Sequence, residues 1–580
     1  MRERKLLVVG DLNVDVLQEV GLEAGYGEER ALRGLDFSIG GGAANLAVVA
    51  GRLGMSPVLI SAIGKDFATK SLRSQISTSG VRPRLIESKK PNAYSIINVN
   101  KKGERSIQSA SNCLDDITAK GIGKKVLPLI APGDVIFFSG FFQLRKLRPG
   151  FKELLAKIKK RQAIVCLDTS FDMYGKWNIS AFLPFIDYLF VNDVELRHIT
   201  KAAKAEGSTP KARADYLMKK GAGMVVLKQG KKGATLFIKG VKGARGVKPL
   251  PFPVKPVKVK VRDTTGAGDA FNAGFVFGMM RDWSPYNCGL AGNFVASKKI
   301  QRHGLVAGLS TPTVKAVERF VAIQNRPMLM VEPDYSKMSM AAASIVASLL
   351  NKKPDLSIAL PTGETPKQLY RILAQWCDKG KVSFRDAKLF AIDEYIGLTQ
   401  SNQSSFTYFL KKNLLDKVDA RSRNVFLMDG KASDLKRECT MHEAAIRKHG
   451  IDLCILGIAP NGHIGFNEPG SCPYSITRVV RLRPETRKKN AKDFPVSSPG
   501  MPGMPGSPSS QVPKKAITIG LKTIRENSRQ ILLLASGSQK KKAVSSLLNS
   551  KDFMKWPAVT LQRHRNVTVL ADRAAAGQFR

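Results

Sequence analysis

The chain has 580 residues, too many for a single hydrophobic core, so about two to four domains are expected. Its hydrophobic content of 43% and aromatic content of 7% are typical of globular domains, and no run of about 18 apolar residues predicts a membrane span. The 93 basic and 47 acidic residues give a net charge of +46, far more than the binding of a small anionic ligand requires.

Two explanations of this charge stay open. A basic protein can bind nucleic acid or another polyanion, or the charge can reflect compositional bias on solvated faces. The basic residues are spread along the whole chain in short groups, such as residues 159–161 and 540–542, and form no single tail. This spread favours solvated faces, and nucleic acid is not an expected partner.

The seven cysteines are scattered without Cys-x-x-Cys spacing. This distribution argues against a disulfide framework and against a zinc site, and it predicts a reducing compartment. The charged N-terminus runs directly into a strand-like segment and lacks the long apolar stretch of a secretory signal. We therefore expect a cytoplasmic protein that is not associated with a membrane.

Short apolar runs rich in β-branched residues alternate with segments of helical period along the chain. Several of these runs end in Gly, Asp or Asn, where a parallel strand would deliver its last residue to a ligand crevice. The pattern predicts an α/β protein with largely parallel sheets. The runs are residues 6–9, 135–138, 163–167 and 225–227 in the first half, and 358–360, 389–392, 453–456 and 531–535 in the second.

The first half contains the string RDTTGAGDAF at residues 262–271. Its small residues Gly266, Ala267 and Gly268 would let backbone N–H groups at a helix start point at an anion. Asp269, directly behind them, could take the proton of an attacking hydroxyl, which is the pairing that phosphoryl transfer requires. No Gly-x-x-x-x-Gly-Lys-Ser/Thr string occurs, so a P-loop enzyme is excluded.

Two further strings lie upstream. Residues 39–47 read IGGGAANLA, and residues 10–15 read GDLNVD at the end of the first predicted strand. With residues 262–271 they resemble the ribokinase-like (PfkB) carbohydrate kinase family over about residues 5–313. The resemblance implies an α/β/α domain that uses ATP and Mg²⁺ to phosphorylate a sugar, with Asp269 as base. Sugar hydroxyls would be bound by Asn13, Asp15, Gly41, Gly42 and Asn45.

The same resemblance implies a nucleotide side to this site. Asn192 and Glu195 would help to place Mg²⁺ and phosphate, and Lys228, Gly230 and Gly233 would lie against the nucleotide. Lys228 stands where the family often has Thr or Ser. The acceptor sugar is left open, because Asp and Asn contacts suit any polyol.

The strand–helix pattern restarts near residue 328, after a predicted helix at residues 314–324. We therefore expect a first domain at residues 1–313, a linker at 314–327 and a second domain at 328–574. Residues 495–513, rich in Pro, Gly and Ser, predict a flexible surface insertion in the second domain.

The second half carries a candidate acid–base pair. Asp393 follows a strand-like run, and the loop NGHIGFNEP at residues 461–469 places His463 and Glu468 five residues apart. A histidine oriented by a carboxylate suits proton transfer. The alternative is a loop histidine that only hydrogen-bonds the backbone.

Three strings favour proton transfer by His463 over a purely structural role. They are PTGETP at residues 361–366, DEYIGL at 393–398 and the loop at 461–469. They resemble the glucosamine-6-phosphate deaminase (isomerase) family over about residues 328–574, a Rossmann-like domain. The sister 6-phosphogluconolactonases share a Gly-His element but lack the Phe-Asn-Glu-Pro ending. The lactonase interpretation is therefore disfavoured.

The resemblance implies conversion of glucosamine 6-phosphate and water to fructose 6-phosphate and ammonia, without a cofactor. His463 would open the sugar ring with Glu468 orienting it, and Asp393 would move the C2 proton. The phosphate would be held by Thr362, Gly363, Thr365, Lys492 and Lys540. Family members are commonly oligomeric, which implies a homo-oligomer.

Two positions depart from the family pattern. Asn461 stands where many members have Asp, so it can orient His463 only by hydrogen bonding. Lys492 stands where an Arg often binds phosphate, and it keeps the charge but loses the bidentate fork.

The sequence thus predicts a bifunctional sugar enzyme. Its kinase half would either make glucosamine 6-phosphate for the second site or act on the fructose 6-phosphate product. Two alternatives stay open: one half is degenerate and serves regulation or sugar binding, or the chain is a basic polyanion-binding protein built on enzyme folds.

Overall fold

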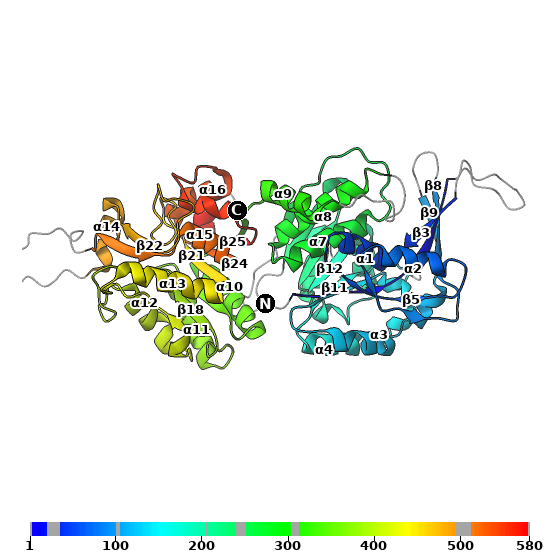
Figure 1. Ribbon diagram of the computed structural model, residues 1–580, viewed down its shortest axis with the longest axis horizontal. Coiled ribbons are helices and arrows are strands. Elements are labelled where there is room, and N and C mark those ends of the chain that lie inside the picture. The colour runs from blue at the N-terminus through cyan, green and yellow to red at the C-terminus, as the bar shows by residue number, and fades with distance from the viewer. Residues whose placement is uncertain are drawn as a thin grey trace, which may run out of the picture. The chain divides into compact units, whose positions relative to one another are not determined.

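The computed structural model describes residues 3–19, 35–99, 105–173, 175–204, 207, 209–238, 251–302, 312–494 and 512–577. They form two compact units, the first ending at Gln324 and the second beginning at Asn325 (Figure 1). None of the helices in these ranges combines the length and hydropathy that crossing a membrane requires. All seven cysteines lie in the described ranges as free thiols.

The first unit is built on a nine-stranded sheet. Neighbouring strands pair in parallel except at one edge, where β14 pairs antiparallel with both β13 and β15. In spatial order they are β15 (Pro251–Val254), β14 (Ala234–Ile238), β13 (Met224–Lys228), β12 (Tyr188–Asn192), β11 (Ile164–Asp168), β10 (Val135–Ser139), β1 (Leu6–Gly10), β4 (Val58–Ile60) and β6 (Arg82–Pro83).

Two small sheets accompany it. A four-stranded sheet has the order β3 (Leu35–Gly40), β2 (Asn13–Glu19), β8 (Ala93–Val99) and β9 (Arg105–Ala110). A two-stranded sheet pairs β5 (Ala62–Ile63) with β7 (Ile86–Glu87). Because β2 follows β1 directly, its first residues lie beside the carboxyl edge of the large sheet.

Helices cover both faces of the nine-stranded sheet, because alternate strand residues face opposite sides. Val8 and Phe137 belong to one buried cluster, whereas their neighbours Val9 and Phe138 belong to the other. The first cluster includes residues of α1 (Gly42–Arg52), α2 (Thr69–Ser77), α7 (Ala267–Met280), α8 (Pro285–Lys299) and α9 (Val314–Gln324). The second includes residues of α3 (Ala119–Val126), α4 (Phe151–Lys160), α5 (Asp193–Ala202) and α6 (Pro210–Lys219).

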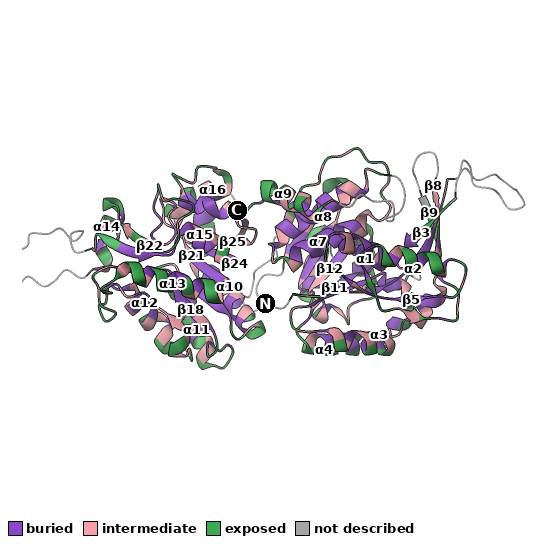
Figure 2. Cartoon of the chain, in the orientation of Figure 1, coloured by how far each residue is buried: buried purple, intermediate pink, exposed green. Residues whose placement is uncertain are grey.

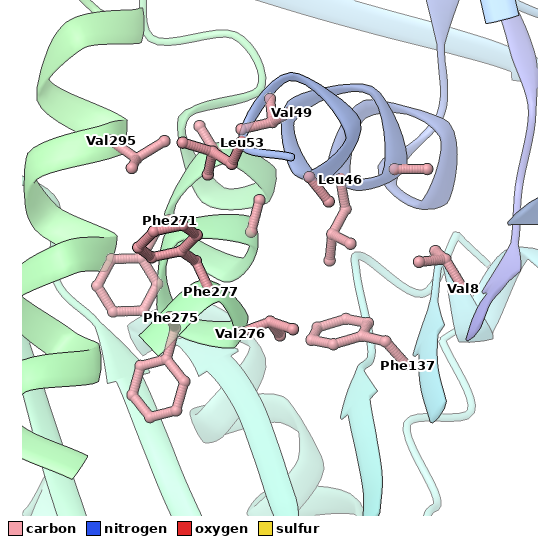
Figure 3. Packing of buried hydrophobic residues seen from close by; sticks show 14 of the residues in the cluster. Val8, Leu46, Val49, Leu53, Phe137, Phe271, Phe275, Val276, Phe277 and Val295 are labelled. Atoms are coloured by element: carbon pink, nitrogen blue, oxygen red, sulfur yellow. The ribbon is translucent and has the colours of Figure 1, made fainter. Parts of the chain in front are cut away.

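Helix α7 is the central helix of the first cluster, and every residue from Ala270 to Met279 is buried (Figure 3). It can lie this close to α8 because Gly274 has no side chain, since a Cβ there would meet Ala291 O at 2.7 Å. The next residue, Phe275, packs edge-on against Phe190 of the sheet at 5.2 Å. The packing of α7 against α8 and the sheet therefore fixes the position of the first turn of α7.

Helix α9 belongs to the first unit. Phe320 stacks on Phe294 of α8 at 4.5 Å, and Val317 and Val321 are fully buried. The segment expected as a linker, residues 314–327, thus begins with a helix whose apolar side the first unit covers.

The second unit contains a seven-stranded sheet whose strand pairs are all parallel. In spatial order the strands are β16 (Met328–Glu332), β25 (Val567–Asp572), β24 (Ser528–Ala535), β21 (Ile451–Gly457), β17 (Ser357–Leu360), β18 (Lys388–Ala391) and β20 (Val425–Phe426). A three-stranded antiparallel sheet has the order β19 (Asp393–Tyr395), β23 (Lys515–Thr518) and β22 (Arg478–Arg481).

The seven-stranded sheet also lies between two layers of helices, and its strand β21 is mostly buried, as the purple in Figure 2 shows. One buried cluster includes residues of α13 (Leu435–His449), α15 (Leu521–Asn527), α16 (Lys541–Asn549) and α17 (Arg573–Ala576). The other includes residues of α10 (Tyr335–Lys352), α11 (Lys367–Asp378) and α12 (Phe406–Asn413). A short helix, α14 (Pro484–Asn490), follows β22.

The insertion expected at residues 495–513 lies outside the described residues except for Val512 and Pro513. Val512 is buried, and its carbonyl oxygen accepts a hydrogen bond from Arg487 Nε at 3.0 Å. The chain that follows this segment is therefore tied to α14.

Candidate active sites

The first turn of α7 forms the anion-facing part of the first site. Gly266 adopts a left-handed conformation with φ of 66° immediately before the helix, and the N–H groups of the first turn have no partner within a helix. The loop before it is fixed by Asp263, which accepts hydrogen bonds from Thr265 N and from buried Lys299 Nζ, each at 2.8 Å. Burial opposes ionisation of Asp263, but Lys299 and Thr265 hold its pKa below the usual value.

Asp269 lies in this first turn and meets the Gly-Gly-Asn string. Asn45 Nδ2 donates to Asp269 Oδ2 at 3.0 Å, and a Cβ on Gly42 would lie 3.3 Å from Asp269 Oδ1. Burial raises the pKa of Asp269 to about 8 against the effect of the Asn45 hydrogen bond, and the Asp168 carboxylate contributes to the rise. The structure thus brings together residues that are more than 200 positions apart.

The residues predicted to bind the sugar leave polar atoms without partners. Asn13 Nδ2 donates to Ser95 Oγ at 3.0 Å, but Asn13 Oδ1 and Asn45 Oδ1 are buried and have no hydrogen bond among the described residues. Burial, together with the nearby Asp11 carboxylate, raises the pKa of Asp15 to about 7. Buried polar atoms of this kind are normally satisfied, so these oxygens are suited to ligand hydroxyls.

Glycine is required at position 41 for two reasons. Gly41 has a φ of 89°, and a Cβ there would meet Asp11 O at 2.7 Å. Asp11 in turn accepts hydrogen bonds from Gly42 N at 2.9 Å and from Ala43 N at 3.0 Å. The Asp11 side chain therefore anchors the start of α1, on which Asn45 is carried.

Asp168, at the end of β11, is a site residue that the sequence reasoning missed. It accepts hydrogen bonds from Lys228 Nζ and from Asn272 Nδ2, each at 2.5 Å. A Cβ on Gly268 would lie 3.5 Å from Lys228 Nζ, so the ammonium also reaches the first turn of α7. Burial opposes the charge on Lys228, but Asp168 and Glu195 raise its pKa above the usual value.

Asn192 and Glu195 form a capping box at the start of α5. Asn192 Oδ1 accepts from Glu195 N at 2.9 Å, and Glu195 Oε2 accepts from Asn192 N at 3.0 Å. Burial and the charge of Asp168 raise the pKa of Glu195 to about 7. Both residues lie beside Lys228, because Asn192 and Lys228 are register partners in neighbouring strands.

The turn after Lys228 contains the two predicted nucleotide-side glycines. Gly230 has a φ of 52° and open space around its Cβ position, whereas a Cβ on Gly233 would meet Val254 O at 2.2 Å. In the described ranges no group of three or more His, Cys, Asp or Glu side chains could hold a metal ion. A Mg²⁺ ion carried by nucleotide phosphates needs only one or two protein carboxylates, and Glu195 can supply one.

The second site is a cavity of about 810 Å³ in the second unit. It lies at the carboxyl ends of β17, β18, β21 and β24, where α/β sheets bind ligands. Its lining brings together seven of the predicted residues, namely Thr362, Gly363, Thr365, Asp393, His463, Lys492 and Lys540.

Asp393 is buried at the start of β19, and its Oδ1 has no hydrogen-bond partner in the described part of the chain. Burial raises the pKa of Asp393 to about 8, and the Glu394 carboxylate adds to the rise. The loop that carries His463 approaches it at Gly465, where a Cβ would lie 3.6 Å from Asp393 Oδ2 and 2.9 Å from Thr518 Oγ1. Only glycine leaves this space open.

His463 is held neutral. Burial lowers its pKa to about 4, and the ammonium groups of Lys489 and Lys540 contribute to the decrease. Its Nδ1 is buried without a hydrogen-bond partner within the described ranges. Asn461 Oδ1 accepts from the backbone N–H of His463 at 3.3 Å, so Asn461 orients the loop and not the imidazole ring.

The structure does not bring Glu468 to His463. The Glu468 carboxylate accepts from the backbone N–H of Arg483 at 3.3 Å and lies 3.5 Å from Arg483 Nε. Glu468 does not line the cavity. Both residues lie in the described part of the chain, and no hydrogen bond joins Glu468 to His463. The physical reason is that the buried carboxylate takes the nearest donors, which Arg483 provides.

The end of the cavity that is predicted to hold phosphate is rich in lysine. Lys540 Nζ donates to Thr365 Oγ1 at 2.6 Å. Burial lowers the pKa of Lys540 to about 8, and the charge of Lys489 contributes. The sequence reasoning missed Lys489 and Asn490, which also line the cavity. The spacing of Lys489 and Lys492, three residues apart, was the available signal.

Comparison with known proteins agrees with this division into two units. The pfkB family carbohydrate kinase model matches residues 3–312. The model for glucosamine-6-phosphate isomerases and 6-phosphogluconolactonase matches residues 335–466. The glucosamine-6-phosphate deaminase of Halalkalibacterium halodurans is 39% identical over 242 residues, which are 42% of this chain and 93% of that protein.

The chain belongs to the PfkB carbohydrate kinases through its first unit and to the glucosamine-6-phosphate deaminase family through its second. The deaminase of Bacillus velezensis is 40% identical over 244 residues, or 42% of this chain and 96% of that protein. Among solved structures, the ribokinase of Thermotoga maritima is 23% identical, covers 55% of this chain and 99% of its own, and superposes with a TM-score of 0.47.

The predicted fold class is confirmed: a ribokinase-like α/β/α unit is followed by a Rossmann-like deaminase unit. The chain is thus a two-domain sugar enzyme at the level of its families.

Proposed function

We propose that the chain is a bifunctional enzyme whose second unit converts glucosamine 6-phosphate and water to fructose 6-phosphate and ammonia. The observation that carries the proposal is the placement of Asp393, His463 and a lysine-rich end in one cavity. The deaminases that are 39% and 40% identical to this unit support the choice of reaction.

Ring opening is assigned to His463. Its neutral imidazole has an unpartnered Nδ1, so it can take the proton of the sugar O1 hydroxyl and return a proton to the ring oxygen. Asn461 and Glu468 are positioning residues in this proposal. Asn461 fixes the loop through the His463 backbone, and Glu468 fixes its far end through Arg483.

Asp393 then acts as the base. It takes the C2 proton of the open-chain sugar and returns a proton at C1, which leaves an imine at C2 that water hydrolyses to the ketone and ammonia. A carboxyl group whose pKa is about 8 is well matched to this transfer near neutral pH. Thr362, Gly363 and Thr365 hold the phosphate through backbone and hydroxyl donors, and Lys492 and Lys540 add charge.

An ammonia-release assay on the full chain with glucosamine 6-phosphate tests this activity. We expect release by the wild type and its loss in Asp393→Asn, because an amide cannot take the C2 proton. Asp378→Asn, at the exposed end of α11, is the matched control and keeps full activity. Absence of ammonia from the wild type would overturn the proposal.

The first unit, within a kinase domain at residues 1–313, transfers phosphate from ATP to a sugar hydroxyl in this proposal. The hydroxyl gives its proton to Asp269 while its oxygen bonds to the γ-phosphorus, and the bond to the bridging oxygen breaks to leave ADP. The N–H groups of Gly266 and Gly268 and the ammonium of Lys228 would face the transferred group, whereas Ala267 N–H donates to Thr264 O at 3.2 Å and shapes the turn. Mg²⁺ bound with ATP would neutralise phosphate charge, with Asn192 and Glu195 nearby.

The acceptor sugar would lie between β2 and α1, against the unpartnered oxygens of Asn13 and Asn45 and the carboxyl group of Asp15. Gly41 and Gly42 leave room for it. Measuring ADP formation with glucosamine, fructose 6-phosphate, ribose and adenosine as acceptors tests the link between the units. Turnover of ribose or adenosine alone would contradict an acceptor that the deaminase reaction supplies or consumes.

A further inference from the structure

The cavity of the second unit carries more positive charge than one phosphate loop explains. Among its described lining residues the basic side chains are Lys367, Arg371, Lys417, Lys489, Lys492 and Lys540, and the carboxylic acids are Glu364 and Asp393. Glu364 already pairs with Lys367 at 2.7 Å, and burial raises the pKa of Asp393 to about 8. Most of the positive charge in the cavity therefore lacks a compensating protein carboxylate.

Lys489 is held over this cavity by its neighbours on α14. The side chain of Asn490 donates from Nδ2 to Tyr395 OH at 2.8 Å, two residues after Asp393 in the chain. Arg487 Nε donates to Val512 O at 3.0 Å. These two bonds fix α14 on either side of Lys489, so its backbone position is set by the fold and not by its own side chain.

The ammonium groups of Lys489 and Lys492 have no hydrogen bond or ion pair with any residue in the described ranges. The two residues are three positions apart, at the junction of α14 and a 3₁₀ turn at Ala491–Asp493. The interaction between them is repulsive. Burial lowers the pKa of Lys489, and the charge of Lys492 lowers it further.

Three lysines are thus held together around one end of a cavity. The charge of Lys492 lowers the pKa of Lys489, and the charge of Lys489 lowers the pKa of Lys540. Such an arrangement costs free energy in the empty cavity and is relieved when an anion enters it. The phosphate loop with Thr365 lies against the same end, because Thr365 is bonded to Lys540.

We propose that Lys489 is a third cationic ligand, beside Lys492 and Lys540, for the phosphate group of a phosphate monoester bound in this cavity. The identity of the monoester as a hexosamine phosphate rests on the proposed function, whereas the anion site does not. Lys489 supplies a charge-assisted hydrogen bond that a lone lysine at position 492 cannot duplicate, since one ammonium lacks the two-donor fork of a guanidinium.

Inorganic phosphate is the probe for this site, measured by isothermal titration calorimetry on the full chain at low ionic strength and pH 7. Lys489→Met weakens binding about tenfold through loss of one charge-assisted bond, and Lys489→Arg retains it. Lys488→Met is the matched control, because both lysines are exposed on α14 but only Lys489 lines the cavity. Phosphate sites of the first unit are common to all variants and cancel in the comparison.

The pH dependence of phosphate binding separates a ligand from a residue that only shapes α14. The charged groups acting on Lys540 are Lys489, which lowers its pKa, and Asp572, which opposes that. Wild-type affinity falls as pH rises through about 8, where Lys540 loses its proton. In Lys489→Met this fall moves to higher pH, because one like charge has been removed.

Equal phosphate affinity in Lys489→Met and wild type overturns the proposal, and so does an equal loss in Lys488→Met. If Lys489→Met alone loses phosphate binding but the wild type releases no ammonia, the anion site stands and the deaminase reaction fails. If ammonia is released and phosphate binding is independent of Lys489, the deaminase reaction stands and the role of Lys489 as a phosphate ligand fails.

Discussion

The two units use an aspartate of similar acidity in different surroundings. Burial raises the pKa of both Asp269 and Asp393 to about 8. Asp269 is hydrogen-bonded to Asn45 and lies near the ammonium of Lys228, whereas Asp393 has an unpartnered oxygen and Glu394 as its charged neighbour. Exclusion of water dominates the pKa of both carboxyl groups, but partners of both signs adjust that of Asp269, whereas the charge of Glu394 only raises that of Asp393 further.

The pKa values of the lysines in the two sites are shifted in opposite directions. Lys228 is inserted between Asp168 and Glu195, which raise its pKa, so it stays charged at physiological pH. Lys540 faces Lys489, and burial with this like charge lowers its pKa to about 8. The comparison teaches that the same residue type is a permanent cation in one site and a titrating group in the other.

The largest expected effect comes from replacing each of the two aspartates by asparagine. Asp393→Asn lowers ammonia release, and Asp269→Asn lowers phosphoryl transfer, each by about 10²- to 10⁴-fold, because each removes a general base. Each variant retains the other activity. Steady-state assays of both reactions on the same preparations check this, and loss of both activities in either variant would contradict two independent sites.

Lys228→Met sharpens the contrast between the two kinds of lysine. Removing this cation raises the pKa of Asp269 further, so less of the base is ionised at pH 7 and phosphoryl transfer falls about tenfold. The acid limb of its pH–rate profile moves to higher pH. Lys228→Arg largely restores activity, and Lys219→Met at the exposed end of α6 serves as the control.

The pH profiles of the two reactions should differ in shape. Ammonia release needs ionised Asp393 and protonated Lys540, both with a pKa of about 8, so its kcat/KM rises, peaks near pH 8 and falls. Phosphoryl transfer rises as Asp269 ionises near pH 8 and then stays level, because Lys228 keeps its proton. A bell-shaped kinase profile with an alkaline limb near pH 8 would remove the proposed distinction.

The smallest effect concerns the loop that carries His463. Gly462 has a φ of 81°, and a Cβ there would meet Trp556 at 2.7 Å, whereas Gly380 has a φ of 63° and open space. Gly380→Ala costs about 1 kcal/mol for its backbone conformation, and Gly462→Ala costs about 2 kcal/mol or more because overpacking is added. Calorimetric unfolding of the full chain measures both, and equal costs would show that Trp556 yields freely.

The motif residues could be predicted from the sequence because each site is built on short strings at strand ends and helix starts. The strings around Asp269 and around His463 specify their own turns through glycines, and the periodicity predicted the parallel sheets. Glu468 shows the limit of this reasoning. Its spacing from His463 suggested a pair, but the fold gives its carboxylate to Arg483, which is 15 residues further along the chain.

By itself the sequence determined two α/β units and their families, and it singled out the aspartate that is proposed as the base in each site. Only the tertiary structure decided the partners that set each group's charge: Asp168 beside Lys228, Asn45 on Asp269, and Lys489 beside Lys540. The physical reason is that a turn or a strand is specified by neighbouring residues, whereas a pKa depends on burial and on charges within a few ångströms. Those charges come from distant parts of the chain, and the packing of helices such as α7 and α14 brings them together.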